Sequence, residues 1–500
     1  MLGEKRRDEP MFYYMKIDDL IPEDHLLRLI HKHVDFSFVR ERVRHLYSHT
    51  GRPSIDPELL VRMLLIGYLY GIRSERRLCE EVGMHVGYRW FTGLNLQDPV
   101  PDHSTFSRNR HERFAEGGLF QAIFDEVVAR CVAHGFVDGR HLTVDATHID
   151  ADASVKSLEP VTVTMGPKEY IGTLERENPL EEEEPWEPGD DHPHRGGKLG
   201  NDTHRSKTDP EARLAKKSPS SGARLCHSVT YVMDNRTRII VGTGIGNPDV
   251  GTDREKALEA LVRMRWRHNL APSATLGADR GYRAGWFIRD LLAAGIIPHI
   301  PVTSLHGGRH RGLYPPSRFI YREEDNSYLC PRGKRLSYTG INRRNAEHVY
   351  RGRKKDCSSC PVRGECTTNR RARTVGRSIY EDAIEKAREL AGTKAYRLSQ
   401  RARKKIEELF GEAKEFMGFR RARFRGRKWI AEQVLMTATA QNIKRLVKLL
   451  AREGKKAAQA ARAAAGSLRT GIRFGTWSSL PGRVSKILLY PVSPPSGIMP

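Results

Sequence analysis

Three acidic side chains, far apart in the sequence, have the setting expected of catalytic carboxylates. Asp145 stands in an alternating stretch, Asp279 follows a short apolar run, and Glu407 lies in a helical segment rich in cations. A carboxylate among β-branched strand residues loses hydration unless a cation or hydrogen bonds compensate for it. A bound metal ion is one such cation, and a solvated edge strand is the alternative reading of Asp145.

The residues around Asp145 and Asp279 predict two β-strands. Val144 and Ala146 alternate with Asp145 and Thr147, which is the period of a strand with one face in a core. Asp279 follows a short predicted strand at 275–278, and open α/β sheets place their chemistry at the carboxyl ends of such strands. The sequence therefore predicts both aspartates on a mixed α/β sheet.

Glu407 is expected on a long helix over residues 399–417. Arg403, Glu407 and Lys414 are four and seven residues apart, so they share one helix face. Arg403 can pair with Glu407, although a surface ladder of ion pairs would show the same spacing. Spacing alone does not exclude three rival carboxylates of this helix, which are Glu408, Glu412 and Glu415.

Two aspartates and a glutamate form a suitable set of ligands for hard divalent cations. Mg²⁺ prefers oxygen ligands. Two such ions, about 3.5–4 Å apart, can activate an attacking oxygen and stabilise a leaving one in phosphodiester chemistry. We therefore expect Asp145, Asp279 and Glu407 to hold two Mg²⁺ (or Mn²⁺) ions.

At these residues the sequence resembles the bacterial insertion-sequence transposases of the DDE type, which have a ribonuclease H-like catalytic domain. The resemblance is carried by the first-strand motif at 143–147 and by Gly-Ala-Asp-Arg-Gly-Tyr at 277–282. It is also carried by the Arg403, Glu407 and Lys414 signature, whose tyrosine position is Gln400 here. The run at 407–411 resembles the family's Glu-x-x-Phe-Gly, which favours Glu407 over its rivals.

The resemblance extends over about residues 10–450 and includes the runs 51–57 and 101–108 of a helical N-terminal domain. It implies that the chain binds the terminal inverted repeats of its own element and cleaves there. It also implies transfer of the freed 3′-hydroxyl ends to target DNA, with no covalent protein intermediate. Synapsis of two DNA ends implies a homodimer in the DNA complex.

Four cysteines between Asp279 and Glu407 form a candidate zinc site. Cys357 and Cys360 make a C-x-x-C pair, with Cys330 before it and Cys366 after it. Four thiolates would complete a tetrahedral structural Zn²⁺ site. Free reduced thiols, or His348 in place of one cysteine, remain the alternatives.

Basic side chains follow the acidic helix and recur in the N-terminal part. The run 420–429 mixes cations with aromatic residues, a pattern that can bind phosphates and stack on unpaired bases. A solvated basic loop is the alternative. The predicted DNA-binding residues are Arg403, Lys414, Arg420, Arg421, Arg423, Arg425 and Arg108.

The surrounding elements divide the chain into predicted domains. A helical DNA-binding domain is expected over 1–136. A ribonuclease H-like catalytic domain is expected over 137–302 and 378–452, with a long loop at 155–222. The remaining segments are a Cys-rich insertion at 303–377 and a tail at 453–500 that we expect to be disordered.

Composition limits the class of protein. The 500 residues carry a formal net charge of +24, which favours a polyanionic partner such as double-stranded DNA. No secretory signal and no membrane-spanning run is expected. Seven cysteines are too few for a disulfide scaffold, so we expect a cytoplasmic, nucleoid-associated protein. Two other functions stay open, namely a non-catalytic DNA-binding relative and a metal-dependent nuclease.

Overall fold

The computed structural model describes residues 15–50, 54–115, 118–161, 176, 200–216, 220–248, 252–268, 274–302, 312–343 and 345–471. Two compact units are distinguished, residues 1–448 and 449–500. Parts of the predicted motif at 51–57, most of the loop at 155–222 and residues 472–500 of the tail lie outside the described residues. None of the described helices combines the length and apolar character needed to cross a membrane.

The N-terminal part is helical, as predicted, because its sequence supplies both caps and apolar faces. Asp56 accepts a hydrogen bond from the Glu58 amide, and Ser74 accepts one from the Arg77 amide, each at the start of a helix. The helices are α1 (Leu26–His33), α2 (Phe38–Val43), α3 (Pro57–Leu69), α4 (Glu75–Met84), α5 (Val86–Thr92), α6 (His103–Asn109) and α7 (Leu119–Ala133), with 3-10 turns at Ile17–Leu20 and Arg44–Leu46 and a π-helical turn at Arg110–Phe114.

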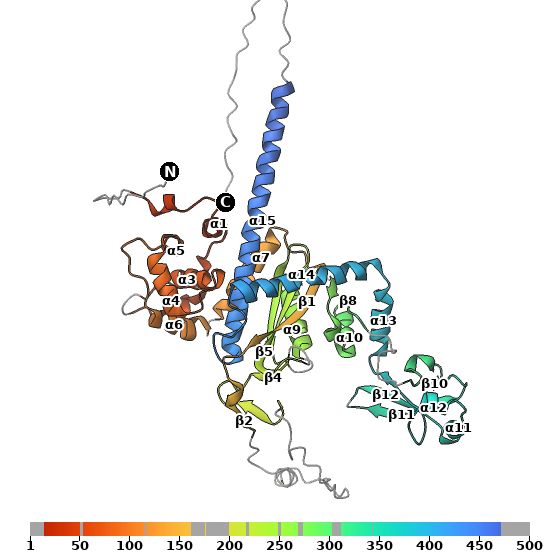
Figure 1. Ribbon diagram of the computed structural model, residues 1–500. Helices are drawn as coiled ribbons and strands as arrows, with labels where there is room; N and C mark the ends of the chain where they lie inside the picture. The colour runs from red at the N-terminus through yellow and green to blue at the C-terminus, as the bar shows by residue number, and fades with distance from the viewer. Residues whose placement is uncertain are drawn as a thin grey trace, which may run out of the picture. The chain divides into compact units, whose positions relative to one another are not determined.

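The central sheet is mixed and has six strands in the described residues (Figure 1). Its order is β4-β5-β1-β7-β8, and β6 pairs with β5 beside β4. Strand β1 is antiparallel to β5 and parallel to β7, which is parallel to β8. The bounds are β1 (His141–Asp150), β4 (Arg213–Ala215), β5 (Arg224–Asp234), β6 (Ile239–Gly246), β7 (Ala274–Gly277) and β8 (Ile296–His299).

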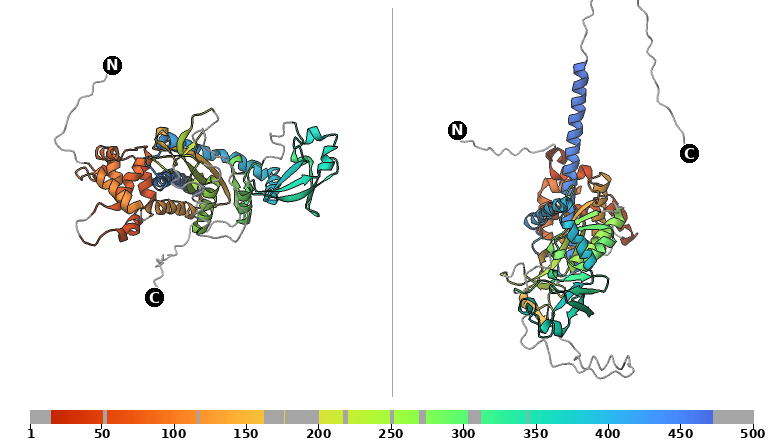
Figure 2. Two further views of the ribbon diagram at one scale, coloured as in Figure 1. Left: turned by 90° about the horizontal axis from the view of Figure 1, so that it is seen from below. Right: turned by 90° about the vertical axis from the view of Figure 1, so that its right-hand side faces the viewer.

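Helices cover both faces of this sheet. Helix α9 (Thr252–His268) packs on β5 and β6, while α14 (Lys394–Phe416) crosses β1, β7 and β8 (Figures 1 and 2). Small residues permit the close approach. A Cβ atom at Gly244 would lie 2.7 Å from the Lys256 Cβ of α9, and one at Gly277 would lie 2.8 Å from the Ser399 Oγ of α14. The glycine of the predicted second motif therefore sets how near α14 lies to the sheet.

Other helices complete this part of the chain. Helix α10 packs on β8 and on α13, and helix α15 follows α14 after a short connection. Their bounds are α10 (Gly285–Ala293), α13 (Glu381–Ala391) and α15 (Arg427–Gly471), with 3-10 turns at Val155–Ser157 and Arg280–Tyr282 and a small hairpin of β2 (Leu158–Pro160) and β3 (His204–Ser206).

Two predicted boundaries differ from the structure. The third-motif helix begins at Lys394 rather than Ser399, because Thr393 caps it by accepting from the Tyr396 amide. The last helix continues to Gly471, whereas the sequence predicted disorder from residue 453. Alanine dominates residues 457–465, and its high helix propensity explains the extension.

A second, five-stranded antiparallel sheet occupies residues 312–378, in the region predicted as Cys-rich. Its order is β13-β12-β11-β10-β9. The elements are β9 (Ile320–Arg322), β10 (Ser327–Leu329), β11 (Arg335–Asn342), β12 (Glu347–Gly352), β13 (Thr374–Ser378), the short helices α11 (Lys354–Ser358) and α12 (Arg363–Cys366), and a 3-10 turn at Pro316–Arg318.

Candidate active site

Strand β1 positions Asp145 on the sheet face that α14 covers. Its cross-strand partner is Tyr231, whose ring stacks on Phe410 of α14 at 4.7 Å between centroids. The Asp145 side chain is largely buried, at 17% exposure, and accepts a hydrogen bond from the Ala146 amide. Asp145 therefore faces the helix that carries Glu407.

Arg403 bridges two of the predicted carboxylates. Its Nη1 atom lies 3.8 Å from Asp145 Oδ2 and 3.5 Å from Glu407 Oε1. Asp279 follows β7, the parallel neighbour of β1, and caps the next turn by accepting from the Gly281 amide at 2.7 Å. The structure thus brings Asp145, Asp279 and Glu407 to one region.

The pKa of Asp145 reflects this crowding. Burial raises the pKa of Asp145 to about 6, and the negative charges of Asp279 and Glu407 act in the same direction. The Ala146 amide and the Arg403 guanidinium oppose the rise. A nearby cation would strongly stabilise the ionised form of a buried carboxyl that lies beside two other carboxyls.

The three rival glutamates of α14 have other partners. Glu412 binds Lys444, Arg445 and Gln441 of α15, whereas Glu408 pairs with Arg238 and Glu415 pairs with Arg420. Glu407 is the member of this set that shares a cation with Asp145. The geometry favours Glu407, in agreement with the motif.

Gln400 connects α14 to the end of the Asp279 strand. Its Nε2 atom donates to the carbonyl oxygens of Ala278, at 3.2 Å, and His299, at 2.5 Å. The glutamine that replaces the signature's tyrosine therefore fixes α14 beside Asp279. The departure from the motif predicted only a lost tyrosine contact and gave no sign of this role.

A groove continues along β1 from Asp145. It has a volume of about 360 Å³. Lys414, predicted as a DNA contact, donates to the Thr147 hydroxyl at 2.5 Å on this groove. Arg224 and His148 also line the groove and were not predicted as site residues, although His148 follows the first-strand motif directly. The lining residues are Ala146, Thr147, His148, Asp150, Arg224, Lys414 and Arg420.

The predicted basic run is only partly available to a ligand. The Arg423 guanidinium lies 4.1 Å from the centre of the Tyr68 ring, and its Nε and Nη2 atoms are shielded from solvent. Phe424 lies under Arg110, and Trp429 packs on His111. These side chains join the N-terminal helices to the α14–α15 connection. In this structure Arg423 and the two aromatic rings contact other protein side chains, and their predicted contacts with DNA stay predictions.

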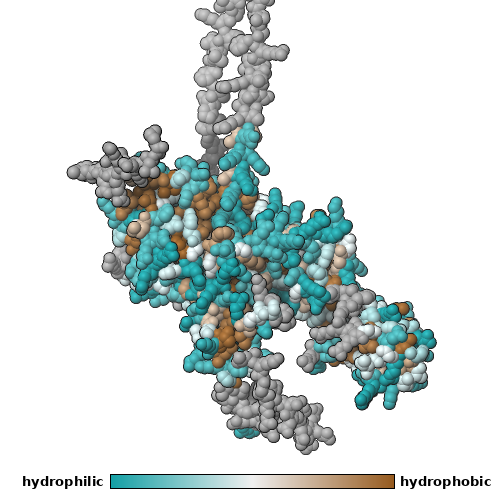
Figure 3. Space-filling model, viewed as in Figure 1, coloured by the Kyte–Doolittle hydropathy of each residue, from teal (hydrophilic) through white to brown (hydrophobic). Residues whose placement is uncertain are grey.

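The remaining predicted cations are at the surface. Arg420, Arg421 and Arg425 are exposed and pair with Glu415 or Asp152. Arg108 lies in the last turn of α6. The face drawn in Figure 3 is mostly hydrophilic over α13 and α14. Exposed pairs of this kind can exchange a carboxylate for a phosphate at little cost.

Two further acidic residues, outside the predicted site, make buried contacts. Asp209 and His227 are both fully buried and form a 3.0 Å contact between Oδ2 and Nε2. Asp253, in the first turn of α9, accepts from the Ser228 hydroxyl and has a pKa raised by burial. Both contacts join segments far apart in the sequence, so local patterns carry no signal for them.

No metal-binding group is preformed among the described residues. Their His, Cys, Asp and Glu side chains form no cluster of three or more that could hold an ion as they stand. The fit of a cation to the acidic site therefore rests on the donor chemistry and on the raised pKa of Asp145.

Two family models match the sequence. The family described as "Transposase domain (DUF772)" matches residues 15–112, and the one described as "Transposase DDE domain" matches residues 329–447. The second match contains Glu407 and the four cysteines of the second sheet, whereas Asp145 and Asp279 lie outside both matches. No curated protein matches the chain.

Three solved structures are similar to the chain. One is a piggyBac transposase synaptic complex with hairpin DNA, at TM-score 0.30 and 10% identity over 84% of this chain and 73% of that chain. The others are a Mos1 transposase paired-end complex with the left transposon end (TM-score 0.15, 12% identity, 59% and 61% covered) and a Mos1 strand transfer complex (0.16, 10%, 73% and 80%).

Proposed function

The chain belongs to the DDE-type transposases, and from this premise we propose that it cleaves DNA at the ends of its own mobile element and joins the freed 3′-hydroxyl ends to target DNA. The observation that carries the proposal is the Arg403 bridge between Asp145 and Glu407, with Asp279 in electrostatic range of Asp145. We assign the mixed sheet that carries these residues to the ribonuclease H-like class.

Asp145, Asp279 and Glu407 would hold two divalent cations, Mg²⁺ or Mn²⁺. When bound, such ions polarise the scissile phosphate and activate the attacking oxygen. The support is the carboxylate donor set and the burial that raises the pKa of Asp145, which a cation would offset. Within the chain, Arg403 holds Asp145 and Glu407 toward each other before DNA arrives.

The groove beside Asp145 suits the backbone of a DNA strand. Lys414, Arg224 and Arg420 line it, and a net charge of +24 favours polyanion binding by the whole chain. Contacts to phosphates would fix the position of the strand without reading its sequence. The attacking group is a water molecule or a DNA hydroxyl, so the site requires no serine or tyrosine nucleophile.

Phosphate contacts by the groove predict a measurable salt dependence. Log affinity for DNA should fall linearly with log salt concentration, and Lys414→Ala should make the slope shallower by about one unit. Fluorescence anisotropy with a labelled duplex measures both slopes. Lys386→Ala, an exposed lysine of α13 that does not line the groove, is the matched control. Equal slopes for wild type and Lys414→Ala would remove Lys414 from the phosphate contacts.

The experiment that tests the function is cleavage in vitro of a plasmid that carries the coding sequence with its flanking DNA. We expect cuts at the two inverted repeats that bound the element, in the presence of Mg²⁺ and not in EDTA. The products should join to a second plasmid. Two copies of the chain would act together on the paired ends. Metal-dependent cutting spread over unrelated DNA would instead indicate a general nuclease.

A further inference from the structure

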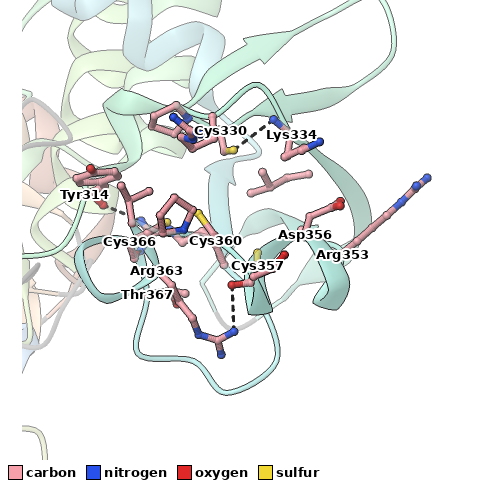
Figure 4. Close-up of a pocket in the computed structure, with 18 of the residues that line it drawn as sticks. Tyr314, Cys330, Lys334, Arg353, Asp356, Cys357, Cys360, Arg363, Cys366 and Thr367 are labelled. Carbon is pink, nitrogen blue, oxygen red and sulfur yellow. Dashed lines mark hydrogen bonds between the residues drawn. The ribbon is translucent and has the colours of Figure 1, made fainter.

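We propose that Cys330, Cys357, Cys360 and Cys366 bind one structural Zn²⁺ ion in the second sheet. The proposal goes beyond DNA cleavage, because the four cysteines are separate from the carboxylate site. All four line one cavity of about 260 Å³ (Figure 4). They come from three segments, namely the turn after β10, helix α11 with the turn that follows it, and helix α12.

The turn at Cys330 is already shaped as a sulfur-presenting loop. The Cys330 amide donates to the Lys334 carbonyl at 2.9 Å, and the Gly333 amide donates to the Cys330 carbonyl at 2.8 Å. The Lys334 amide then donates to Cys330 Sγ at 3.3 Å. Gly333 has a φ of +71°, which permits this tight turn. Hydrogen bonds from amides to sulfur orient a thiolate and stabilise its charge, as second-shell contacts do in metal sites.

The other three cysteines are held by their backbone, which leaves the sulfur atoms toward the cavity. Arg363 donates to the Cys357 carbonyl, and Arg373 donates to the Cys366 carbonyl at 2.8 Å. The Cys360 amide donates to the Cys357 carbonyl in the C-x-x-C turn. Cys366 lies within electrostatic range of the other three thiols. The two arginines therefore donate hydrogen bonds to backbone carbonyl oxygens, and the thiols stay available to an ion.

The small core of this sheet gives a physical reason for a metal ion. Its buried apolar residues are Phe319, Tyr328, Leu336, Tyr350 and Val375, with Cys330 and Cys366 packed against them. A unit of this size rarely buries enough apolar surface to be stable alone, and small natural domains add disulfides or a metal. The four cysteines of this sheet are free thiols in the structure, so each can serve as a metal ligand.

Binding of an ion requires the four sulfur atoms to move closer to one another. No three of these side chains are grouped tightly enough to hold an ion as they stand in the described residues. Tetrahedral coordination at about 2.3 Å per Zn–S bond sets the required geometry. Rotation of the cysteine side chains into the cavity supplies part of this movement. His348, the alternative ligand, packs on Tyr338 and does not line the cavity.

The test is metal analysis of untagged, full-length protein. We expect about one zinc ion per chain. The variants Cys330→Ser and Cys360→Ser, one from each half of the site, should reduce the zinc content to a small fraction of an ion per chain. Cys79→Ser, a partly exposed cysteine on α4, is the matched control and should retain it. Asp145→Asn should also retain it, so a failure of the zinc proposal is distinguishable from a failure of the proposed cleavage site.

Cobalt substitution keeps the test independent of the folding of the variants. Co²⁺ bound to the wild-type chain should give the intense visible bands of a tetrahedral site and a thiolate charge-transfer band in the near-ultraviolet. Folded wild-type protein with no zinc and no such spectrum would overturn the proposal. Full zinc content in both site variants would overturn it as well.

Discussion

Glu407 and Glu408 are neighbours on α14 with different surroundings, which makes them a matched pair for mutation. Both side chains are exposed, but Glu407 shares Arg403 with Asp145, whereas Glu408 pairs with Arg238. Glu407→Gln should reduce DNA cleavage by at least about 100-fold, because it removes a charge that the metal-ion mechanism needs. Glu408→Gln should stay within about twofold of wild type.

A gel assay of end cleavage at saturating Mg²⁺ measures both variants. Thermal unfolding of the same samples shows whether the fold is intact. Activity that survives in Glu407→Gln and is lost in Glu408→Gln would reverse the assignment of the third carboxylate.

Helix α14 keeps its place through ion pairs with α15. Glu412 binds Lys444, Arg445 and Gln441, and its side chain is about 20% exposed. Burial alone would raise the pKa of Glu412. The Lys444 hydrogen bond and the Arg445 charge outweigh it and lower the pKa to about 2. The carboxylate therefore contributes stability that is present above its unfolded pKa, near 4.5, and is lost as the pH falls toward 2.

Glu412→Gln should reduce the free energy of unfolding by about 2–3 kcal/mol at pH 7. Urea unfolding should show this gap narrowing as the pH falls below about 4.5. Glu415→Gln, which breaks an exposed pair with Arg420, should reduce the free energy of unfolding by no more than about 1 kcal/mol. A pH-independent gap for Glu412→Gln would mean that packing, rather than the ion pair, carries the effect.

Local signals predicted the elements, and nonlocal contacts escaped prediction. The caps Asp56 and Ser74 and the alternation around Asp145 are readable within a few residues, and the structure has the corresponding helices and strand. The Gln400 link to Ala278 spans 122 residues, and the Asp209–His227 contact joins β5 to a turn. Sequence patterns predict helices, strands and caps, but they do not predict which distant backbone carbonyl will accept a hydrogen bond from a side chain.

The three predicted carboxylates illustrate the same distinction within the site. Local sequence predicts their residue types and the elements that carry them, namely a strand for Asp145, a strand end for Asp279 and a helix for Glu407. The choice of Glu407 among four glutamates of α14 needed either a family motif or the Arg403 geometry. The charge pattern did not predict the packing of Arg423 on Tyr68. A cation-rich run has the same sequence pattern whether it lies on a surface or between two packed helical regions.

At the scale of the whole molecule, buried charges join the N-terminal helices to helix α15. Arg110 pairs with Glu75 of α4 and lies with Nε 3.6 Å from Glu432 Oε2 of α15. Burial raises the pKa of Glu432 to about 7, Arg110 and Arg423 oppose the rise, and Glu75 adds to it. A folded pKa above the unfolded value means that the contribution is fully present below about pH 4.5 and is lost as the pH rises through 7.

Glu432→Gln should therefore change the pH dependence of stability. Between pH 5 and pH 8 the free energy of unfolding of the wild type should fall by about 1–3 kcal/mol relative to that of the variant, because glutamine does not titrate. Urea unfolding at the two pH values measures this difference. Glu81→Gln, which breaks a pair with Arg77 on α4, is a control that should not alter the pH dependence. A parallel pH dependence for Glu432→Gln and wild type would show that Glu432 is ionised in the fold throughout.

The central claim is that Asp145, Asp279 and Glu407 act together on a DNA phosphate. Its most direct test compares wild type with Asp145→Asn on DNA carrying the element's own ends, with cleavage and binding measured on the same samples. We predict that Asp145→Asn binds the ends as tightly as wild type and cuts them at no detectable rate in Mg²⁺. Cleavage by Asp145→Asn at the wild-type rate would contradict the account.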